Sequence, residues 1–260
     1  MNVKDLLSLN GKVVLLTGGT GRDGKGILEG LLEADGTVIT ASRNLKANEE
    51  VVSEYKKQGY DAHAMLVDQG DHESVLAVKQ QIEAQFGRLD VFVNNAIAWV
   101  AKSYDSPLEE FAESMQINAT GMYDITREMA DLIAKSGGGS VVNIASMFGM
   151  FGPDLSNYEG TDTQALGGDY FFHKGGMISL TRYLARVLAD KNIRVNAISP
   201  GGILSPDIQH EVFLKNYTGK VPVGRMANMD DIKGVVVLLA SEASAYINGE
   251  NILMDGGMHA

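Results

Sequence analysis

Short runs of β-branched and apolar residues alternate along the chain with longer stretches in which apolar residues recur at helical spacing. After the run Val13–Thr17, apolar side chains recur at positions 27, 28, 31 and 32, which is the spacing of one helix face. This alternation indicates βαβ units, and therefore an α/β fold with a doubly wound parallel sheet of about seven strands and helices on both faces. The other predicted strands are 37–41, 62–67, 91–93, 140–145, 193–198 and 251–254, with helices in 107–135 and from about 170 to 190. No repeat, linker or charge run divides the chain, so residues 1–260 are expected to form one domain.

Composition narrows the range of functions. The chain carries 33 acidic and 22 basic side chains, a formal charge of −11, and an acidic protein gains nothing from a phosphate backbone, so nucleic acid is not an expected partner. Cysteine is absent and the five histidines are scattered, so neither a disulfide nor a metal site is expected. No secretory signal and no apolar run of about 18 residues is evident, which favours a cytoplasmic protein without a membrane partner.

A glycine-rich turn follows the first predicted strand and opens the first predicted helix. It reads Thr17-Gly18-Gly19-Thr20-Gly21-Arg22-Asp23-Gly24. Glycines at this place in a Rossmann-type fold let the backbone turn tightly and approach a pyrophosphate, which the free N–H groups of the helix then hold. We therefore expect a dinucleotide to bind here.

The end of the second strand indicates which dinucleotide binds. A carboxylate there accepts a hydrogen bond from the ribose 2′-OH of NAD, whereas an arginine accommodates the 2′-phosphate of NADP. The sequence has Ser42 and Arg43 and no acid at this point. NADP(H) is therefore favoured, with Arg22 or Lys25 as further partners of the phosphate, and NAD(H) stays possible.

Several motifs follow one another along the chain, each at a strand end or on a helix. After the glycine turn come Asn94-Asn95-Ala96, Asn118, Ser146, Tyr170 with Lys174, and Pro200-Gly201. Together they resemble the short-chain dehydrogenase/reductase family over essentially the whole chain. Within that family the C-terminal half looks most like sugar-acid and polyol dehydrogenases of the gluconate 5-dehydrogenase kind, and 3-oxoacyl thioester reductases come next.

The resemblance implies a set of site residues. Asn118, Ser146, Tyr170 and Lys174 would be catalytic, with Asn118 holding a water that links Lys174 to solvent. From the residues themselves, we expect Met147, Phe148, Phe151 and Tyr158 to line the substrate site. The resemblance also implies a homotetramer paired through the helix near 170–190 and the last strand, where Met177 and Ile178 could contribute. The cofactor would contact Gly18, Thr20, Gly21, Arg22, Gly24, Ser42, Arg43, Asp68, Gln69, Asn94, Asn95, Ala96, Lys174, Pro200 and Gly201.

The tyrosine and lysine suit the chemistry of carbonyl reduction. Hydride transfer to a ketone produces an alkoxide, which needs a proton donor and a hydrogen bond to the oxygen. Tyr170 and Lys174 are four residues apart on a predicted helix and so lie on one face. An ammonium beside the phenol is expected to lower its pKa from about 10. His173 lies within the same motif, and a structural or substrate-lining role is expected for it.

Two features depart from the family pattern. Arg22 occupies a position that is usually glycine, and Tyr170 lies 24 residues after Ser146, which is longer than the family's usual spacing. Tyr158 is nearer the usual distance but lacks the lysine, so Tyr170 is preferred. The insert Met150–Asp169 is then expected to form a loop over the pocket, and its acids Asp154, Glu159 and Asp162 argue mildly against a strongly anionic substrate; a solvated loop or a subunit contact is the alternative.

We therefore expect an oxidoreductase that interconverts a ketone and a secondary alcohol, on a small-molecule substrate such as a sugar acid or polyol. A 3-oxoacyl thioester reductase is the nearest alternative. A relative that binds nucleotide without turnover belongs to another class, as does a non-redox epimerase or dehydratase that keeps its cofactor bound and unconsumed.

Overall fold

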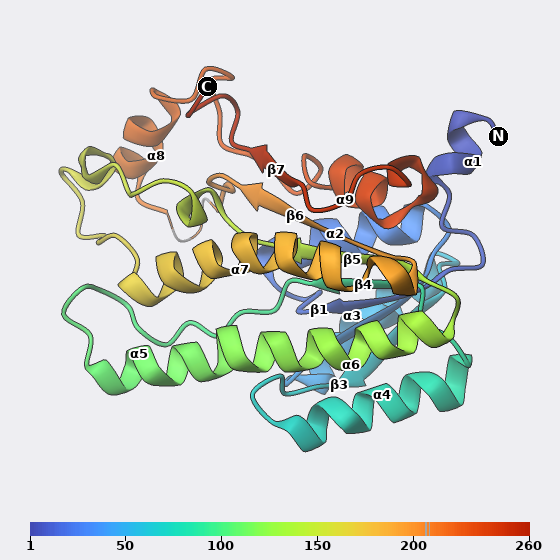
Figure 1. Cartoon of the computed structure of the whole chain (residues 1–260). Helices are drawn as coiled ribbons and strands as arrows, with labels where there is room; N and C mark the ends of the chain where they lie inside the picture. The colour runs from blue at the N-terminus through green and yellow to red at the C-terminus, as the bar shows by residue number, and fades with distance from the viewer. Residues whose placement is uncertain (206, 208) are drawn as a thin grey trace.

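The computed structural model describes residues 1–205, 207 and 209–260. Seven parallel strands form one sheet in the order β3-β2-β1-β4-β5-β6-β7. The expected doubly wound parallel sheet of about seven strands is therefore confirmed (Figure 1). The strands are β1 (Val13–Thr17), β2 (Thr37–Ser42), β3 (Ala62–Leu66), β4 (Val91–Asn94), β5 (Gly139–Ile144), β6 (Ile193–Pro200) and β7 (Asn251–Met254).

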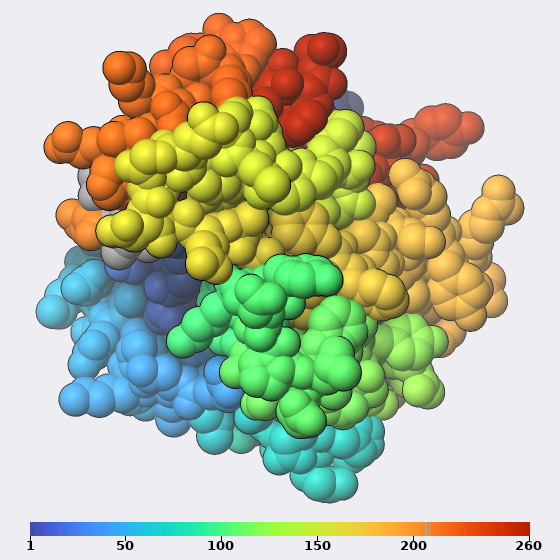
Figure 2. Space-filling model, turned by 90° about the vertical axis from the view of Figure 1, so that its left-hand side faces the viewer, coloured from blue at the N-terminus to red at the C-terminus, as the bar shows by residue number. Residues whose placement is uncertain are grey.

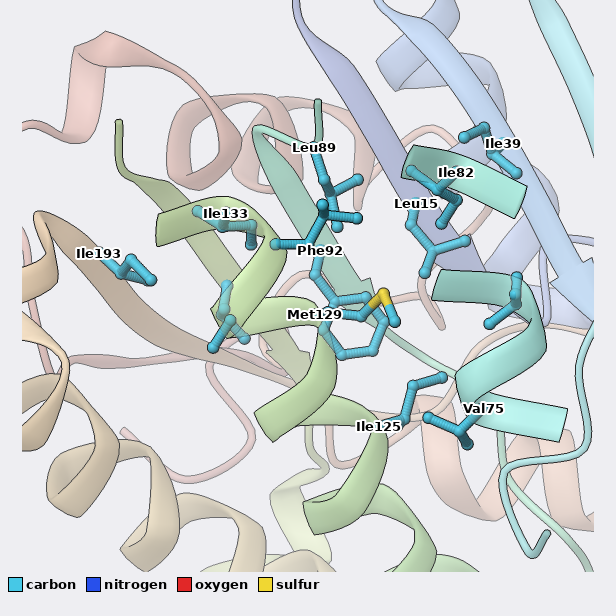
Figure 3. Close-up of a cluster of buried hydrophobic side chains, with 14 of the residues drawn as sticks. Leu15, Ile39, Val75, Ile82, Leu89, Phe92, Ile125, Met129, Ile133 and Ile193 are labelled. Carbon is cyan, nitrogen blue, oxygen red and sulfur yellow. The ribbon is translucent and has the colours of Figure 1, made fainter. Parts of the chain in front are cut away.

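Helices cover both faces of the sheet. Residues alternate along a strand between its two faces, and β1 shows the consequence: Val13 and Leu15 belong to one apolar cluster, whereas Val14 and Leu16 belong to the other. Helices α4, α6 and α7 pack on the first cluster, part of which Figure 3 shows, and α2, α3 and α9 pack on the second. The helices are α1 (Val3–Leu7), α2 (Arg22–Glu33), α3 (Leu45–Lys57), α4 (His72–Phe86), α5 (Leu108–Met115), α6 (Met122–Lys135), α7 (Gly168–Val187), α8 (Glu211–Thr218) and α9 (Lys233–Ala240).

Helices α5 and α6 are joined by one turn of π-helix, η1 (Gln116–Gly121), so that they run as a single rod in Figure 1. A π-turn inserts an extra residue into the helix and turns the side chains on either side relative to one another. Asn118, one of the predicted catalytic residues, lies in this turn and is buried.

The strand order reverses between β1 and β4, because β2 and β3 lie on one side of β1 and β5, β6 and β7 lie beyond β4. In doubly wound folds the ligand crevice forms at the carboxyl ends of the strands at such a switch point. The glycine turn follows β1, Asn95 follows β4 and Ser146 follows β5. The topology therefore brings the predicted site residues to one edge of the sheet.

Candidate active site

Side-chain hydrogen bonds join the ends of β1 and β4 at the switch point. The Thr17 hydroxyl accepts from the backbone N–H groups of Asn95 and Ala96, both at 3.1 Å. The Asn95 amide donates in return to the carbonyls of Thr17 at 3.0 Å and Gly18 at 3.1 Å. Thr17 and Asn95 therefore fix the floor of the crevice.

The glycine turn is tightly packed. Gly18 has a φ of +71°, and a Cβ at Gly24 would lie 2.0 Å from the Gly18 carbonyl oxygen, so neither position accepts a side chain without rearrangement. Helix α2 begins directly after Gly21, and no side chain caps it. Its first N–H groups are thus available at the crevice, which fits the diphosphate of a dinucleotide.

The end of β2 presents positive charge and no carboxylate. Arg43 and Arg22 are both exposed and line the crevice, and within the described part of the chain neither forms an ion pair. Ser42 donates to the buried Asn48 at 3.0 Å. A guanidinium group that is free to turn toward the crevice fits the extra phosphate of NADP.

A cavity of about 1080 Å³ runs from this turn past the ends of β4, β5 and β6. All of the predicted cofactor contacts line it, except Asn94. Asn94 is the last residue of β4 and is fully buried, and its amide donates to the Asn143 side chain at 3.4 Å. The expectation for Asn94 is therefore wrong, because strand alternation turns its side chain into the interior and leaves Asn95 at the crevice.

Lys174 is the most buried charged group of the site. Its Nζ donates to the Ile144 carbonyl, at the end of β5, at 2.6 Å, and burial lowers the pKa of its ammonium to about 8, while the charge of Asp23 opposes that shift. Its Nζ also lies 5.8 Å from the centre of the Tyr170 ring. The predicted pairing of Tyr170 and Lys174 on one face of α7 is thus present in the structure.

Tyr170 is less acidic than the sequence suggests. We expected Lys174 to lower the pKa of the phenol, but burial raises it to about 12, and the nearby Ser146 side chain offsets only part of this. Trp99 stacks on the Tyr170 ring at 5.1 Å with 11° between planes, and Phe148 meets its edge at 6.5 Å. The expected direction was wrong because these rings exclude water, which penalises the charged phenolate.

Ser146 follows β5 and faces the same cavity. Its Oγ accepts from the backbone N–H of Phe148 at 3.1 Å, and this bond leaves the hydroxyl proton free to donate. A donor at this point can stabilise the oxygen of a carbonyl or alkoxide.

Asn118 does not line the cavity but lies behind it. Its side-chain oxygen accepts from the Ala98 N–H and its nitrogen donates to the Ala98 carbonyl, both at 2.8 Å. The same nitrogen donates to Ser114 at 3.1 Å, and Ser114 donates to the buried Asp169 at 2.5 Å. The Asn118 side chain therefore holds the loop after β4, and the water-relay role stays a prediction.

The insert 150–169 covers the cavity, as expected. Figure 2 looks onto this face, where the yellow insert lies between the orange α8 region and the green segment after β4. Asn216 of α8 donates to backbone carbonyls of Ser156, Asn157 and Glu159. Tyr158, Met147 and Phe148 line the cavity as predicted.

Two expectations about the insert are corrected. Phe151 stacks on His259 at 3.8 Å instead of lining the cavity. The acids Asp154, Glu159 and Asp162 do not line it either; Asp154 pairs with Lys220 at 2.7 Å, so these acids do not bear on substrate charge. His173 is buried outside the cavity and its pKa is lowered to about 3 by burial, which leaves it a structural role.

Several cavity residues were not predicted. Asp23 lies in the first turn of α2, where burial raises the pKa of its carboxyl and the charges of Lys174 and Arg22 oppose that shift. Its place inside the glycine turn was a signal that sequence reasoning did not use. Trp99, four residues beyond Asn95, and the pair Phe213 and Tyr217 on one face of α8 also line the cavity. No local pattern placed α8 over the site.

The described residues show neither a membrane-spanning helix nor a metal-binding cluster. No helix among them is both long and apolar enough to cross a bilayer. No group of three or more His, Cys, Asp or Glu side chains among them is arranged to hold a metal ion.

The fold and the cavity thus define a dinucleotide-binding protein with a tyrosine–lysine pair beside the cofactor turn. A family model described as enoyl-(acyl carrier protein) reductase matches residues 24–259. The chain is 32% identical to a 3-oxoacyl-[acyl-carrier-protein] reductase, FabG, of Aquifex aeolicus over 259 residues, which cover 97% of this chain and 99% of the relative. The chain therefore belongs to the short-chain dehydrogenase/reductase family, and it is an oxidoreductase of that family.

Solved structures agree on the fold. A short-chain type dehydrogenase/reductase from Mycobacterium marinum is 30% identical, with a TM-score of 0.87 and all of both chains covered. A gluconate 5-dehydrogenase from Burkholderia cenocepacia J2315, solved with NADP and tartrate, is 24% identical with a TM-score of 0.88, covering 99% of this chain and 98% of that one. At that identity the likeness is one of fold, so it does not decide between the sugar-acid and the thioester subgroups.

Proposed function

We propose that the protein interconverts a ketone and a secondary alcohol by hydride transfer and that it prefers NADP(H). The main support is that one cavity is lined both by Ser146, Tyr170 and Lys174 and by the glycine turn with Arg43. A nicotinamide cofactor supplies the hydride when it is bound.

The chain's own residues handle the oxygen and the proton. The Ser146 hydroxyl donates a hydrogen bond to the substrate oxygen, and Tyr170 gives its proton to that oxygen as it becomes an alkoxide. With the pKa of Tyr170 raised to about 12, the phenol stays protonated at neutral pH and acts as the acid in reduction. Lys174, held by the Ile144 carbonyl, places positive charge beside the phenolate that this transfer leaves.

The preference for NADP(H) rests on Arg43 and Arg22, which are exposed at the cavity and form no ion pair among the described residues. Trp99 is the only tryptophan in the chain and lines the cavity, so energy transfer from its emission to reduced nicotinamide reports cofactor binding. We expect NADPH to bind more tightly than NADH, and Arg43→Ala to weaken NADPH alone. Equal loss for both cofactors would contradict the assignment of Arg43 to the phosphate.

Turnover is tested with Tyr170→Phe, which keeps the ring and removes the proton. Ketone reduction, followed by the absorbance of NADPH, is expected to fall at least about 100-fold, the lower end for a general acid, while energy transfer from Trp99 persists. Tyr158→Phe is the matched control, and its rate of ketone reduction is expected to stay far closer to that of the parent. If the parent binds cofactor and reduces no ketone, the protein is a nucleotide-binding relative without turnover; cofactor that stays bound and unconsumed while a sugar nucleotide reacts indicates the epimerase or dehydratase class.

Family likeness alone supports two candidate substrate classes. Sugar acids or polyols follow from the resemblance of the C-terminal half, and 3-oxoacyl thioesters follow from the name of the Aquifex relative. Assays with 5-ketogluconate and with an acetoacetyl thioester distinguish them.

A further inference from the structure

The substrate end of the cavity is built from rings and offers little charge. The lining residues beyond Ser146 are mainly aromatic or apolar, and they come from the loop after β4, from the turn after β5, from the insert and from the segment around α8. They include Trp99, Met147, Phe148, Tyr158, Phe213 and Tyr217.

Charged lining residues gather at the cofactor end. Arg22 and Asp23 belong to the glycine turn, and Arg43 and Asp68 follow β2 and β3. At the substrate end the described lining holds Lys174, which is buried and donates to the Ile144 carbonyl, and His210, whose ring nitrogen accepts from the Val212 N–H as the cap of α8. No arginine and no free lysine lines this end among the described residues.

A substrate carboxylate or phosphate would therefore lose its water here without gaining a cationic partner. Burial of an unpaired charge is strongly unfavourable. The nearby Lys220 does not change this, because it pairs with Asp154 at 2.7 Å and does not line the cavity.

Trp99 gives this end its most specific feature. Its ring lies nearly parallel to that of Tyr170, at 5.1 Å and 11°, yet 60% of the residue is exposed. The loop that carries it is fixed one residue earlier, where Asn118 makes two hydrogen bonds of 2.8 Å to the backbone of Ala98. Trp99 thus offers a large apolar surface directly beside the proton donor Tyr170, and the backbone next to it is held in place.

We propose that the cavity selects an uncharged carbonyl compound in which a flat ring adjoins the carbonyl group, with Trp99 as the residue that binds the ring. The inference rests on the proposed ketone reduction and names the substrate class of that site. Once the carbonyl oxygen lies between Ser146 and Tyr170, a ring bonded to the carbonyl carbon has Trp99 and Phe148 as its neighbours. Aromatic rings packed in this way contribute beyond the area that they bury.

Four related ketones separate charge from ring. Ethyl benzoylformate has the ring and no charge, benzoylformate has both, ethyl pyruvate has neither, and pyruvate has charge alone. With NADPH at fixed pH we expect kcat/KM for ethyl benzoylformate to exceed that for benzoylformate and for ethyl pyruvate by about tenfold or more, a typical scale for such discrimination.

Variants assign the ring preference to Trp99. Trp99→Ala is expected to lower the ratio of kcat/KM for ethyl benzoylformate to kcat/KM for ethyl pyruvate by about fivefold or more, since the stacking contribution is lost. Trp99→Phe is expected to retain most of the parent's ratio. Tyr104→Ala is the matched control, because Tyr104 lies on the same loop with 95% of its surface exposed and should leave the ratio unchanged.

The outcomes separate this inference from the function on which it rests. Reduction of pyruvate or 5-ketogluconate in preference to the uncharged aromatic ester overturns the substrate class and leaves ketone reduction standing. An unchanged ratio in Trp99→Ala overturns the role of Trp99. Reduction of none of these compounds, nor of the acetoacetyl thioester, with either cofactor contradicts the proposed function and the inference with it.

Discussion

At the scale of single residues, burial determines the acid–base behaviour of the site. Lys174 has a pKa lowered to about 8 and Tyr170 a pKa raised to about 12, each chiefly because its charged form loses water. Asp23 is the acid whose charge opposes the shift of Lys174. Asp23 lies inside the glycine turn, where its negative charge would be close to the expected diphosphate. The positive charges of Lys174 and Arg22 compensate for this carboxylate.

A pH profile tests this arrangement. Reduction requires protonated Tyr170, which persists to about pH 12, and the Lys174 ammonium, which loses its proton near pH 8. We therefore expect kcat/KM for ketone reduction to be level below about pH 8 and to fall above it. In Asp23→Asn the charge that supports the ammonium is gone, so the fall should begin at lower pH.

The control for that profile is Glu54→Gln, which removes an exposed acid on α3 away from the cavity. It should leave the profile in place. If kcat/KM of Asp23→Asn falls over the same pH range as that of the parent, Asp23 does not support the charge of Lys174.

The sequence predicted which groups meet but not how acidic they are. Residues four apart on a helix share a face whatever surrounds them, so Tyr170 and Lys174 could be paired from spacing alone. The stacking of Trp99 and Phe148 on Tyr170 brings together loops that are distant in the chain. That tertiary packing reverses the expected direction of the phenol pKa.

At the scale of elements, a buried polar chain connects the rod α5–η1–α6 to α7. Ser114 of α5 donates to Asp169, which directly precedes Tyr170 in α7, and accepts from Asn118 of η1. All three side chains are buried. The connection therefore sets the relative placement of Tyr170 and of the loop that carries Trp99.

Removal of the central hydroxyl tests this connection. Ser114→Ala leaves an Asp169 oxygen buried without its donor, and a loss of this kind costs about 1–3 kcal/mol. We expect a lower free energy of unfolding by that amount in chemical denaturation, together with a reduced kcat. Ser179→Ala, at an exposed position of α7, is the control, and equal stability of the two variants would show that the connection contributes nothing.

Elements with clear periodicity were predicted well, and the short ones were not. The strands were found because each is an apolar run that ends in glycine or polar residues. Helix α9, whose sequence is KGVVVLLA, lacks a polar face because it packs in the apolar cluster that it shares with α2. The π-turn at Asn118 has no local sequence signature either, so the helical segments were predicted but the junction between them was not.

At the scale of the whole molecule, sheet topology explains why so many site residues could be predicted. In a parallel sheet all carboxyl ends lie at one edge, so residues that follow successive strands converge whatever their separation in the chain. This held for Gly18, Arg43, Asp68, Asn95 and Ser146, all of which line the cavity. It did not hold for α8, which reaches the cavity from outside the repeating βαβ pattern; the insert was expected over the pocket only because of the long spacing between Ser146 and Tyr170.

The expected tetramer needs a different contact surface from the one first assigned. Met177 and Ile178 are 4% and 5% exposed within the chain itself and pack in an internal cluster, so they cannot form a subunit contact. The apolar residues that α7 leaves exposed are Phe172, Tyr183 and Val187. Phe172 also meets the edge of Phe111 of α5 at 6.1 Å, which extends the exposed apolar surface of α7 onto the neighbouring helix.

If the chain forms the expected tetramer, this surface of α7 is where it assembles. Tyr183→Glu combined with Val187→Glu places two charges on it and is expected to convert the tetramer into smaller species in sedimentation velocity, because a buried unpaired carboxylate is strongly unfavourable. Tyr104→Glu, which alters a residue with 95% of its surface exposed on the loop after β4, is the control and should leave the mass unchanged. A parent that sediments as a monomer contradicts the tetramer, and a tetramer that survives the double substitution shows that α7 is not the contact.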